Sequence, residues 1–276
     1  MASLPLTEIV LAAGSVADDV SFVALSDLAR VLDDVDDYRI IGGHMVTALV
    51  ARWRLGDHLF RETGDTDLGA PPIVLKDHRI VRRLVDLGYE PLAGDRFGRP
   101  VEDVVGMARG ADPPLAIIDV LIPAYTSRPR TNQRVGDDLV AIEVPGLATA
   151  LQRDAVSLGV DLVRLNGETS SIRLAYADEV SAVLLKALVT GQRRKDTDVV
   201  DLWRSLEVAY VAGVGPSAFD NNHGKRAAEL IRSLFPADGG RGGAALASAQ
   251  GLSADAVLER VTRIRALADR VLGPER

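Results

Sequence analysis

Two aspartates separated by a single residue form the part of the sequence whose spacing most directly suggests chemistry. In RETGDTDLG, Asp65 and Asp67 stand at positions i and i+2, and Arg61 and Thr63 precede them with the same spacing. In a β-strand all four side chains would project from one face. Two carboxylates on one face repel each other unless a cation lies between them, and oxygen-only ligands suit Mg²⁺. The alternative is a solvated strand face, with Arg61 as a neighbouring counter-charge.

A glycine pair, Gly42 and Gly43, lies between a short apolar segment, YRII, and a segment with helical periodicity, HMVTALVARWRL. The two segments predict a strand that turns directly into a helix. Residues without a Cβ allow backbone N–H groups and the positive end of the helix to approach an anion such as a phosphate. The alternative is that the pair serves only the geometry of the turn.

A third aspartate, Asp119, interrupts an otherwise continuous apolar segment, PLAIIDVLIP. Such a segment predicts a central strand of a sheet. A carboxylate there must be paired, bound to a metal or protonated, because burial of an isolated charge is costly. Together with Asp65 and Asp67 it would complete the carboxylate layout of a metal-assisted nucleotidyl transfer site. The alternative is a strand edge at which Asp119 reaches solvent.

A second charged group lies in the segment KALVTGQRRKDTDVVDLWRSL. Lys186 and Arg193 are seven residues apart, which places them on one face of a helix. Asp198 and Asp201 are three residues apart on the next predicted helix. Such a group could bring cations to a triphosphate and a carboxylate to an incoming hydroxyl. The alternative is a network of ion pairs in a helical hairpin, which contributes little energy at a surface.

These segments together resemble the nucleotidyltransferase superfamily that includes DNA polymerase beta. Within it they are most similar to the AbiEii and MenT-type toxins of bacterial toxin–antitoxin and phage-defence systems. The pieces that carry the resemblance stand in the family's order: IIGGHMVTAL at 40–49, RETGDTDLG at 61–69, IIDVLI at 117–122 and KALVTGQRRKDTDVVDLWRSL at 186–206. Their order and spacing carry the likeness more than any one piece does.

The resemblance implies a role for each of these residues. Catalysis is expected of five charged residues: Asp65, Asp67, Asp119, Lys186 and Asp201. The first three would also bind the metal, which is Mg²⁺ or, in its place, Mn²⁺. Asp119 or Asp201 could accept the proton of the attacking hydroxyl. Nucleotide binding is expected of Gly42, Gly43, His44, Arg61, Thr63, Arg193 and Asp198.

The resemblance also implies an activity, which is the transfer of a nucleoside monophosphate from an NTP to an acceptor with release of pyrophosphate. The implied acceptor is the 3′ end of tRNA, and the implied protein is a toxin that a cognate antitoxin protein neutralises. An arginine-rich segment with Arg128, Arg130 and Arg134 could meet an RNA backbone or form a solvated loop. Two other functions stay open: a nucleotidyltransferase that acts on a small molecule, of the antibiotic-modifying kind, or on a protein, and a catalytically degenerate module that binds NTP.

The composition excludes several other classes of protein. The chain has 276 residues, of which 47% are hydrophobic and 26% charged, which is typical of a globular protein. It contains no cysteine, and so it has no disulfide, thiolate zinc site or cysteine nucleophile. A net charge of −7 does not favour nucleic-acid binding through the average field. No apolar run is long enough to span a membrane, and the N-terminus lacks a basic region, so we expect a cytoplasmic protein without a membrane segment.

The periodicity of the remaining sequence predicts the elements that position these residues. Strands are expected near 38–41, 61–69, 114–123, 138–144, 160–165 and 171–176. Helices are expected at 25–35, 44–55, 77–87, 178–190, 197–211, 222–235 and 254–272, and residues 237–245 are expected to form a glycine-rich connector. We therefore predict an α/β nucleotidyltransferase-fold domain over 1–176, with a mixed sheet and flanking helices. A helical C-terminal domain over 177–276 would follow, with the active site in the cleft between the two domains.

Overall fold

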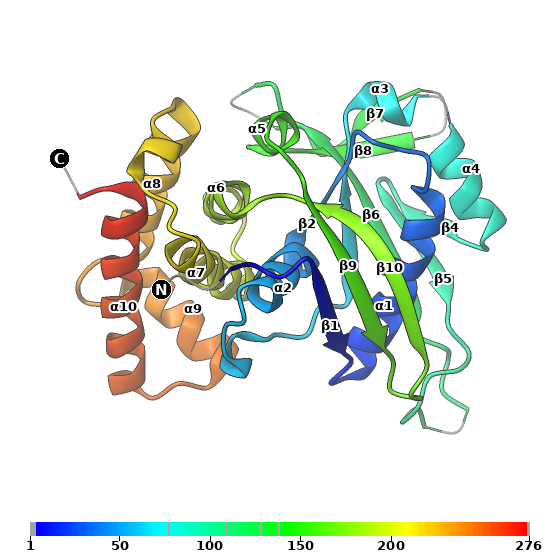
Figure 1. The fold of residues 1–276 in the computed structure, drawn as a ribbon, viewed down its shortest axis with the longest axis horizontal. Coiled ribbons are helices and arrows are strands. Elements are labelled where there is room, and N and C mark those ends of the chain that lie inside the picture. The colour runs from blue at the N-terminus through cyan, green and yellow to red at the C-terminus, as the bar shows by residue number, and fades with distance from the viewer. Residues whose placement is uncertain (1–3, 77, 109, 127–128, 137–138, 275–276) are drawn as a thin grey trace. The chain divides into compact units, whose positions relative to one another are not determined.

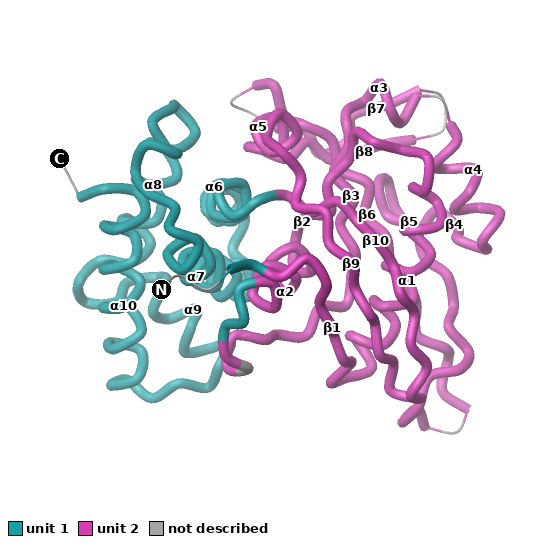
Figure 2. Tube along the Cα trace, viewed as in Figure 1, with its two compact units in different colours: residues 1–5, 53–55, 178–276 teal, residues 6–52, 56–177 magenta. Residues whose placement is uncertain are grey.

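The computed structural model describes residues 4–76, 78–108, 110–126, 129–136 and 139–274. The chain forms two compact units, which Figure 2 distinguishes by colour. The sheet-containing unit comprises residues 6–52 and 56–177, and the helical unit comprises residues 178–276 together with 1–5 and 53–55. Trp53 belongs to the helical unit, and its indole Nε1–H donates a hydrogen bond of 2.7 Å to Glu179 of the same unit. The catalytic role expected of residues 1–176 stays a prediction.

A mixed sheet forms the centre of the sheet-containing unit (Figure 1). In the part of the chain that the structure describes, its strands are β1 (Glu8–Ala12), β2 (Arg39–Ile41), β3 (Asp65–Gly69), β4 (Glu90–Ala93), β5 (Arg96–Pro100), β6 (Leu115–Pro123), β7 (Gln133–Val135), β8 (Leu139–Val144), β9 (Val156–Val163) and β10 (Thr169–Tyr176). Their order is β1-β9-β10-β2-β3-β6-β5-β4, with β8 also paired to β6 and β7 paired to β8. β3 and β6 are therefore neighbours at the middle of the sheet, and they run parallel to each other.

The helices of this unit are α1 (Val16–Val31), α2 (Gly42–Arg52), α3 (Pro72–Leu75), α4 (Arg79–Asp86) and α5 (Leu147–Gln152). α1 packs against β3, β6 and β10, and α2 packs against β1, β2 and β3. Ser15 begins α1, since its side chain accepts a hydrogen bond from the backbone N–H of Asp18 in the way of an N-cap. The helix starts there, well before the expected residue 25.

The two faces of β3 and β6 differ in character because side chains alternate along a strand. Thr66 and Ile118 are fully buried, and the Thr66 hydroxyl lies 3.5 Å from the carbonyl oxygen of Ser21 in α1. Asp65 and Asp67 alternate with Thr66 and so point to the opposite face. The apolar face fixes the strands against α1, and the acidic residues are left on the other face.

The helical unit contains α6 (Glu179–Thr190), α7 (Asp196–Val211), α8 (Asn222–Leu234), α9 (Gly240–Gln250) and α10 (Ala254–Leu272), with a 3₁₀ turn at Pro216–Phe219. α7 packs against α6, α9 and α10, and α8 packs against α6 and α10. Side chains of Asp178, Asn221 and Ser253 cap the N-termini of α6, α8 and α10. The predicted α/β fold class, a mixed sheet with flanking helices followed by a helical C-terminal part, is confirmed. Among the described residues, no helix is long and apolar enough to cross a membrane.

The glycine-rich segment is the clearest error of the sequence prediction. Residues 240–250 form α9 and not a connector. A Cβ on Gly242 would overlap the ring of Phe235, and one on Gly240 would come within 2.5 Å of Pro236. The small residues therefore allow the helix to pack closely on the end of α8, a tertiary gain that outweighs the low helix propensity of glycine.

The acidic strand is shorter than expected. β3 begins at Asp65, so Arg61 and Thr63 lie in the segment before the strand and do not continue its face. Four further strands, β1, β4, β5 and β7, were not predicted from the sequence. All four residues of β4 are exposed, and β7 has three residues, so neither has the apolar pattern of a buried strand.

Candidate functional site

The turn between β2 and α2 brings the glycine pair against the acidic strand. Gly42 has φ of +71°, a conformation that favours glycine. A Cβ at this position would overlap the carboxylate of Asp67. The first residue of α2 is thus packed directly on Asp67, and only a residue without a side chain fits there.

The second glycine, Gly43, packs against Arg61 and Thr63 in the segment before β3. A Cβ on Gly43 would lie 2.7 Å from both Cγ2 and Oγ1 of Thr63 and 3.1 Å from Nη2 of Arg61. Thr63 is buried, and its backbone N–H donates a hydrogen bond of 3.0 Å to Asp18 in α1. Within the described residues, its hydroxyl oxygen is buried without a hydrogen-bond partner. The structure therefore brings Gly42, Gly43, Arg61, Thr63 and Asp67 together at the positive end of a helix, where an anion is favoured.

The three aspartates of the sheet share one face. In the parallel pairing of β3 with β6, Asp67 lies opposite Asp119 and Asp65 lies opposite Ile117. Paired residues project to the same side, and residues two apart on one strand do so as well. The structure thus brings Asp65, Asp67 and Asp119 to one face of the sheet, beside the start of α2.

Arg96, which was not predicted from the sequence, is the partner of Asp119. β5 runs antiparallel to β6 with Arg96 opposite Asp119. Its Nε and Nη2 donate hydrogen bonds of 2.7 and 2.6 Å to the two carboxylate oxygens of Asp119, and Nη2 lies 3.4 Å from Asp65. The hydrogen bonds to Asp119 raise the pKa of the Arg96 guanidinium. Of the states that a buried Asp119 could adopt, the structure shows the paired one.

A further carboxyl group, that of Asp95, lies next to this pair. The backbone of Asp95 is joined to β6, since its carbonyl oxygen accepts a hydrogen bond of 2.9 Å from Val120. Burial raises the pKa of the Asp95 carboxyl, and the charge of Asp119 raises it further. The local sequence AGDRFGRP contains no signal for this proximity, which comes from the pairing of β5 with β6.

The three carboxylates suit Mg²⁺ in chemical type, because this ion takes oxygen ligands. As the side chains stand, however, the described residues contain no group of three or more His, Cys, Asp or Glu side chains arranged to hold a metal ion. Arg96 supplies the positive charge at Asp119 and Asp65. The metal assignment stays a prediction.

A hollow of about 610 Å³ adjoins the glycine turn. Arg61, Thr63 and His44 line it, together with Asp18 at the start of α1 and the half-exposed Phe60. His44 is buried, and its ring centroid lies 6.3 Å from that of Phe22. His44 therefore lies at the edge of this hollow, and its predicted contact with a nucleotide stays untested.

The charged residues of the helical unit form two groups. Lys186 Nζ lies 2.8 Å from one carboxylate oxygen of Asp201, and Arg204 Nη1 lies 2.8 Å from the other. Asp201 is only 1% exposed. Both of its oxygens are held by cations inside the unit, which argues against the predicted role of Asp201 as acceptor of a proton from an external hydroxyl. The part of Arg204 in this group was not predicted from the sequence.

Arg193 and Asp198 form the second group, through hydrogen bonds of 2.7 and 3.0 Å from the guanidinium to the two carboxylate oxygens. Asp198 is buried, whereas 57% of the Arg193 side chain is exposed. This ion pair agrees with the alternative reading of the motif. The prediction that Arg193 shares a helical face with Lys186 is wrong, because α6 ends at Thr190 and Arg193 lies in the connection to α7. The contact of Arg193 and Asp198 with a nucleotide stays a prediction.

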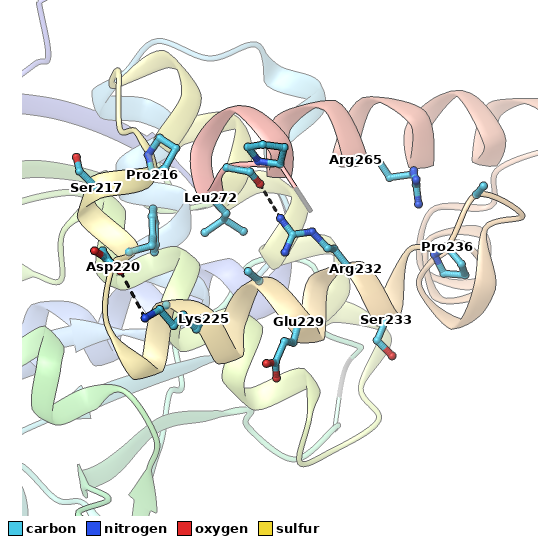
Figure 3. A pocket seen from close by; sticks show the side chains of 16 residues that line it. Pro216, Ser217, Asp220, Lys225, Glu229, Arg232, Ser233, Pro236, Arg265 and Leu272 are labelled. Atoms are coloured by element: carbon cyan, nitrogen blue, oxygen red, sulfur yellow. Dashed lines mark hydrogen bonds and ion pairs between the residues drawn. The ribbon is translucent and has the colours of Figure 1, made fainter. Parts of the chain in front are cut away.

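Two other features hold none of the predicted site residues. A hollow of about 1150 Å³ lies in the helical unit between the 3₁₀ turn, α8 and the end of α10 (Figure 3). Its charged groups are engaged within the unit, since Arg232 donates to the carbonyl oxygen of Gly273 and Lys225 lies 3.6 Å from Asp220.

In the arginine-rich segment, Arg130 hydrogen-bonds Gln133, and Arg128 lies outside the described residues.

No protein-family model matches the chain, and a search of curated proteins finds no match. Among solved structures, the chain is similar to the crystal structure of an antigenic nucleotidyltransferase-like protein from Paracoccidioides brasiliensis. The two are 18% identical with a TM-score of 0.45, over 79% of this chain and 89% of that chain. The function proposed below depends on the geometry of the site.

Proposed function

We propose that this chain is a nucleotidyltransferase, which moves a nucleoside monophosphate from an NTP to a hydroxyl of an acceptor. The observation that supports this most directly is the contact of Gly42 with Asp67 and of Gly43 with Thr63. These contacts place the N-terminus of α2, where an anion is favoured, beside a sheet face with three carboxylates. Few reactions need both, and phosphoryl transfer from a triphosphate is one of them.

In the proposed reaction the acceptor oxygen attacks the α-phosphorus. The bond from this phosphorus to the bridging oxygen breaks, and pyrophosphate leaves with that electron pair. The N-terminus of α2, Arg61 and the buried Thr63 hydroxyl bind the phosphate oxygens, and Asp119 accepts the hydroxyl proton. Mg²⁺ or Mn²⁺, which Asp65, Asp67 and Asp119 would hold, supplies neutralisation of the developing charge.

The resemblance of the motifs adds a finer proposal on the substrate and the biological role. The acceptor is the 3′ end of tRNA, and the protein acts as a toxin that a partner antitoxin neutralises. Arg130 and Arg134 are cations of the described chain that an RNA backbone could contact. A gene for an antitoxin beside the gene for this chain would support this role.

The test is incubation with each labelled NTP, total tRNA and Mg²⁺. We expect one NTP to label the RNA, and Asp67→Asn to lower the rate by about 100-fold or more, the size of effect seen when one group is lost from a phosphoryl-transfer site. Asp161→Asn is the matched control. Asp161 lies on the exposed face of β9, where it accepts a hydrogen bond from Ser171.

Three other outcomes of this experiment would each contradict a different part of the proposal. Full transfer by Asp67→Asn would show that the assigned site is not the catalytic one. Transfer to a small hydroxyl compound or a protein, with none to tRNA, would retain the nucleotidyltransferase and reject the acceptor. A thermal shift with Mg²⁺ and NTP, without transfer to any acceptor, would indicate a module that only binds the nucleotide.

A further inference from the structure

Arg96 occupies a position among the acidic side chains that the proposed function gives to a divalent cation. Its guanidinium holds both oxygens of Asp119 and reaches towards one oxygen of Asp65. The contact bridges two strands, because Asp119 is on β6 and Asp65 on β3. The positive charge of Arg96 thus compensates Asp119 and Asp65 on this face.

This contact and a metal ion at the same carboxylates oppose each other. A divalent cation binds carboxylate oxygens at about 2.0–2.6 Å, and Arg96 already occupies one lone pair on each oxygen of Asp119. The cation would also place two positive charges beside the guanidinium, and like charges repel each other at this distance. While the guanidinium stays at Asp119, binding of the cation there is therefore weakened.

The surroundings of Arg96 allow its guanidinium to move. Its side chain is 43% exposed, whereas that of Asp119 is 11% exposed, so the arginine can leave towards solvent while the aspartate stays. Arg99, three residues further along the same strand, contrasts with it. Arg99 points away from this face and is held by Asp27, whose side chain is only 7% exposed.

We propose, building on the proposed function, that Arg96 is a displaceable counter-ion of the carboxylate face, which keeps Asp119 in place until a divalent cation replaces the guanidinium. The cation then binds in competition with Arg96. Arg96 thus lowers the affinity of the carboxylate face for a divalent cation, and binding of the cation is coupled to a movement of the Arg96 side chain.

The experiment measures Mn²⁺ binding by calorimetry and by the electron paramagnetic resonance of the free ion, with no nucleotide present. If Arg96 competes, Arg96→Gln binds Mn²⁺ about tenfold more tightly than the unaltered chain, which is within the usual range of coupling between two ligands. Arg96→Lys keeps one charge but cannot hold both oxygens, and its affinity lies between the two. Arg173→Gln, which removes an exposed arginine that pairs with Glu8 on another part of the sheet, leaves Mn²⁺ affinity unchanged.

A second readout is the thermal midpoint. In EDTA, Arg96→Gln unfolds at a lower temperature than the unaltered chain. Addition of Mn²⁺ raises the thermal midpoint of Arg96→Gln by more than it raises that of the unaltered chain. Equal or weaker Mn²⁺ affinity in Arg96→Gln would overturn the proposal, since a competitor must weaken binding. Absence of Mn²⁺ binding in all variants, with NTP present or absent, would overturn the metal site and with it the proposed function. Binding that Asp119→Asn retains would place the ion elsewhere and overturn the role of Arg96.

Discussion

The carboxylate face of the sheet and the Lys186–Asp201–Arg204 cluster of the helical unit are both ion-pair groups, but they differ in access to solvent. On the sheet, the side chains of Arg96 and Asp65 are 43% and 34% exposed. In the helical unit, those of Lys186, Asp201 and Arg204 are 7%, 1% and 1% exposed. A charge that can reach water can exchange its partner, whereas a buried one cannot do so without a large desolvation cost.

This difference assigns separate tasks to two groups that share the same residue types. Under the proposal above, the sheet face accepts a ligand because its cation, Arg96, is replaceable. The buried cluster joins α6 to α7 and fixes the position of Lys186, whose ammonium is held by Asp201. We therefore expect Asp201 to be a positioning and folding residue, and the sheet aspartates to be the ones that touch the substrate.

The largest effect on stability is expected from Asp201→Asn. This change removes the carboxylate that pairs with both Lys186 and Arg204 inside the unit, and loss of one partner from a buried ion-pair group costs about 3–5 kcal/mol in the free energy of unfolding. Urea unfolding followed by circular dichroism measures it. Asp198→Asn is the matched control, because its partner Arg193 is 57% exposed and can be solvated, so we expect a loss of about 1 kcal/mol or less. Equal losses in both variants would contradict the distinction between the two kinds of group.

The comparison also shows which parts of the site the sequence could predict. Gly42, Asp65, Asp67 and Asp119 were found because each stands in a local pattern: a turn between apolar segments, an alternation, or a charge in an apolar run. Arg96 was missed because its partner lies 23 residues away and meets it only through the register of β5 on β6. Strand register is a non-local property that no short window of sequence contains.

The same reason accounts for the errors in the fold. Long, strongly periodic helices such as α6, α7 and α10 were placed within one or two residues of their bounds. The short strands β4 and β7 lack an apolar pattern and were not predicted; every residue of β4 is exposed, and β7 has only three residues. In α9 the glycines serve close packing, and composition alone cannot distinguish this use from a flexible connector.

A smaller effect on stability, with a larger one on ligand binding, is expected from Gly42→Ala. The new methyl group would meet the Asp67 carboxylate, and alanine is strained at this positive φ, so we expect a loss of about 2–3 kcal/mol. Gly167→Ala is the matched control, because Gly167 also has a positive φ, of +86°, but has open space around it, and about 1 kcal/mol is expected. Calorimetric titration with NTP and Mg²⁺ should show weaker binding only in Gly42→Ala. Unchanged NTP affinity in Gly42→Ala would show that the glycine turn takes no part in nucleotide binding.

The smallest effect is expected from an ion pair at the surface, that of Asp34, whose side chain is 51% exposed. Asp34 is bonded to Arg83 and Arg79, and the hydrogen bond from Arg83 lowers the pKa of its carboxyl from 3.8 to about 2. A carboxyl whose pKa is lower in the folded chain stabilises it above the unfolded pKa, and this contribution is lost as the pH falls through the folded value. Asp34→Asn should therefore be slightly less stable than the unaltered chain at pH 5, and the difference should shrink between pH 4 and pH 2. Urea unfolding at several pH values in this window measures the difference. A constant gap across the window would mean that Asp34 acts through packing and not through its charge, and an effect as large as that of Asp201→Asn would remove solvent access as the basis of the comparison.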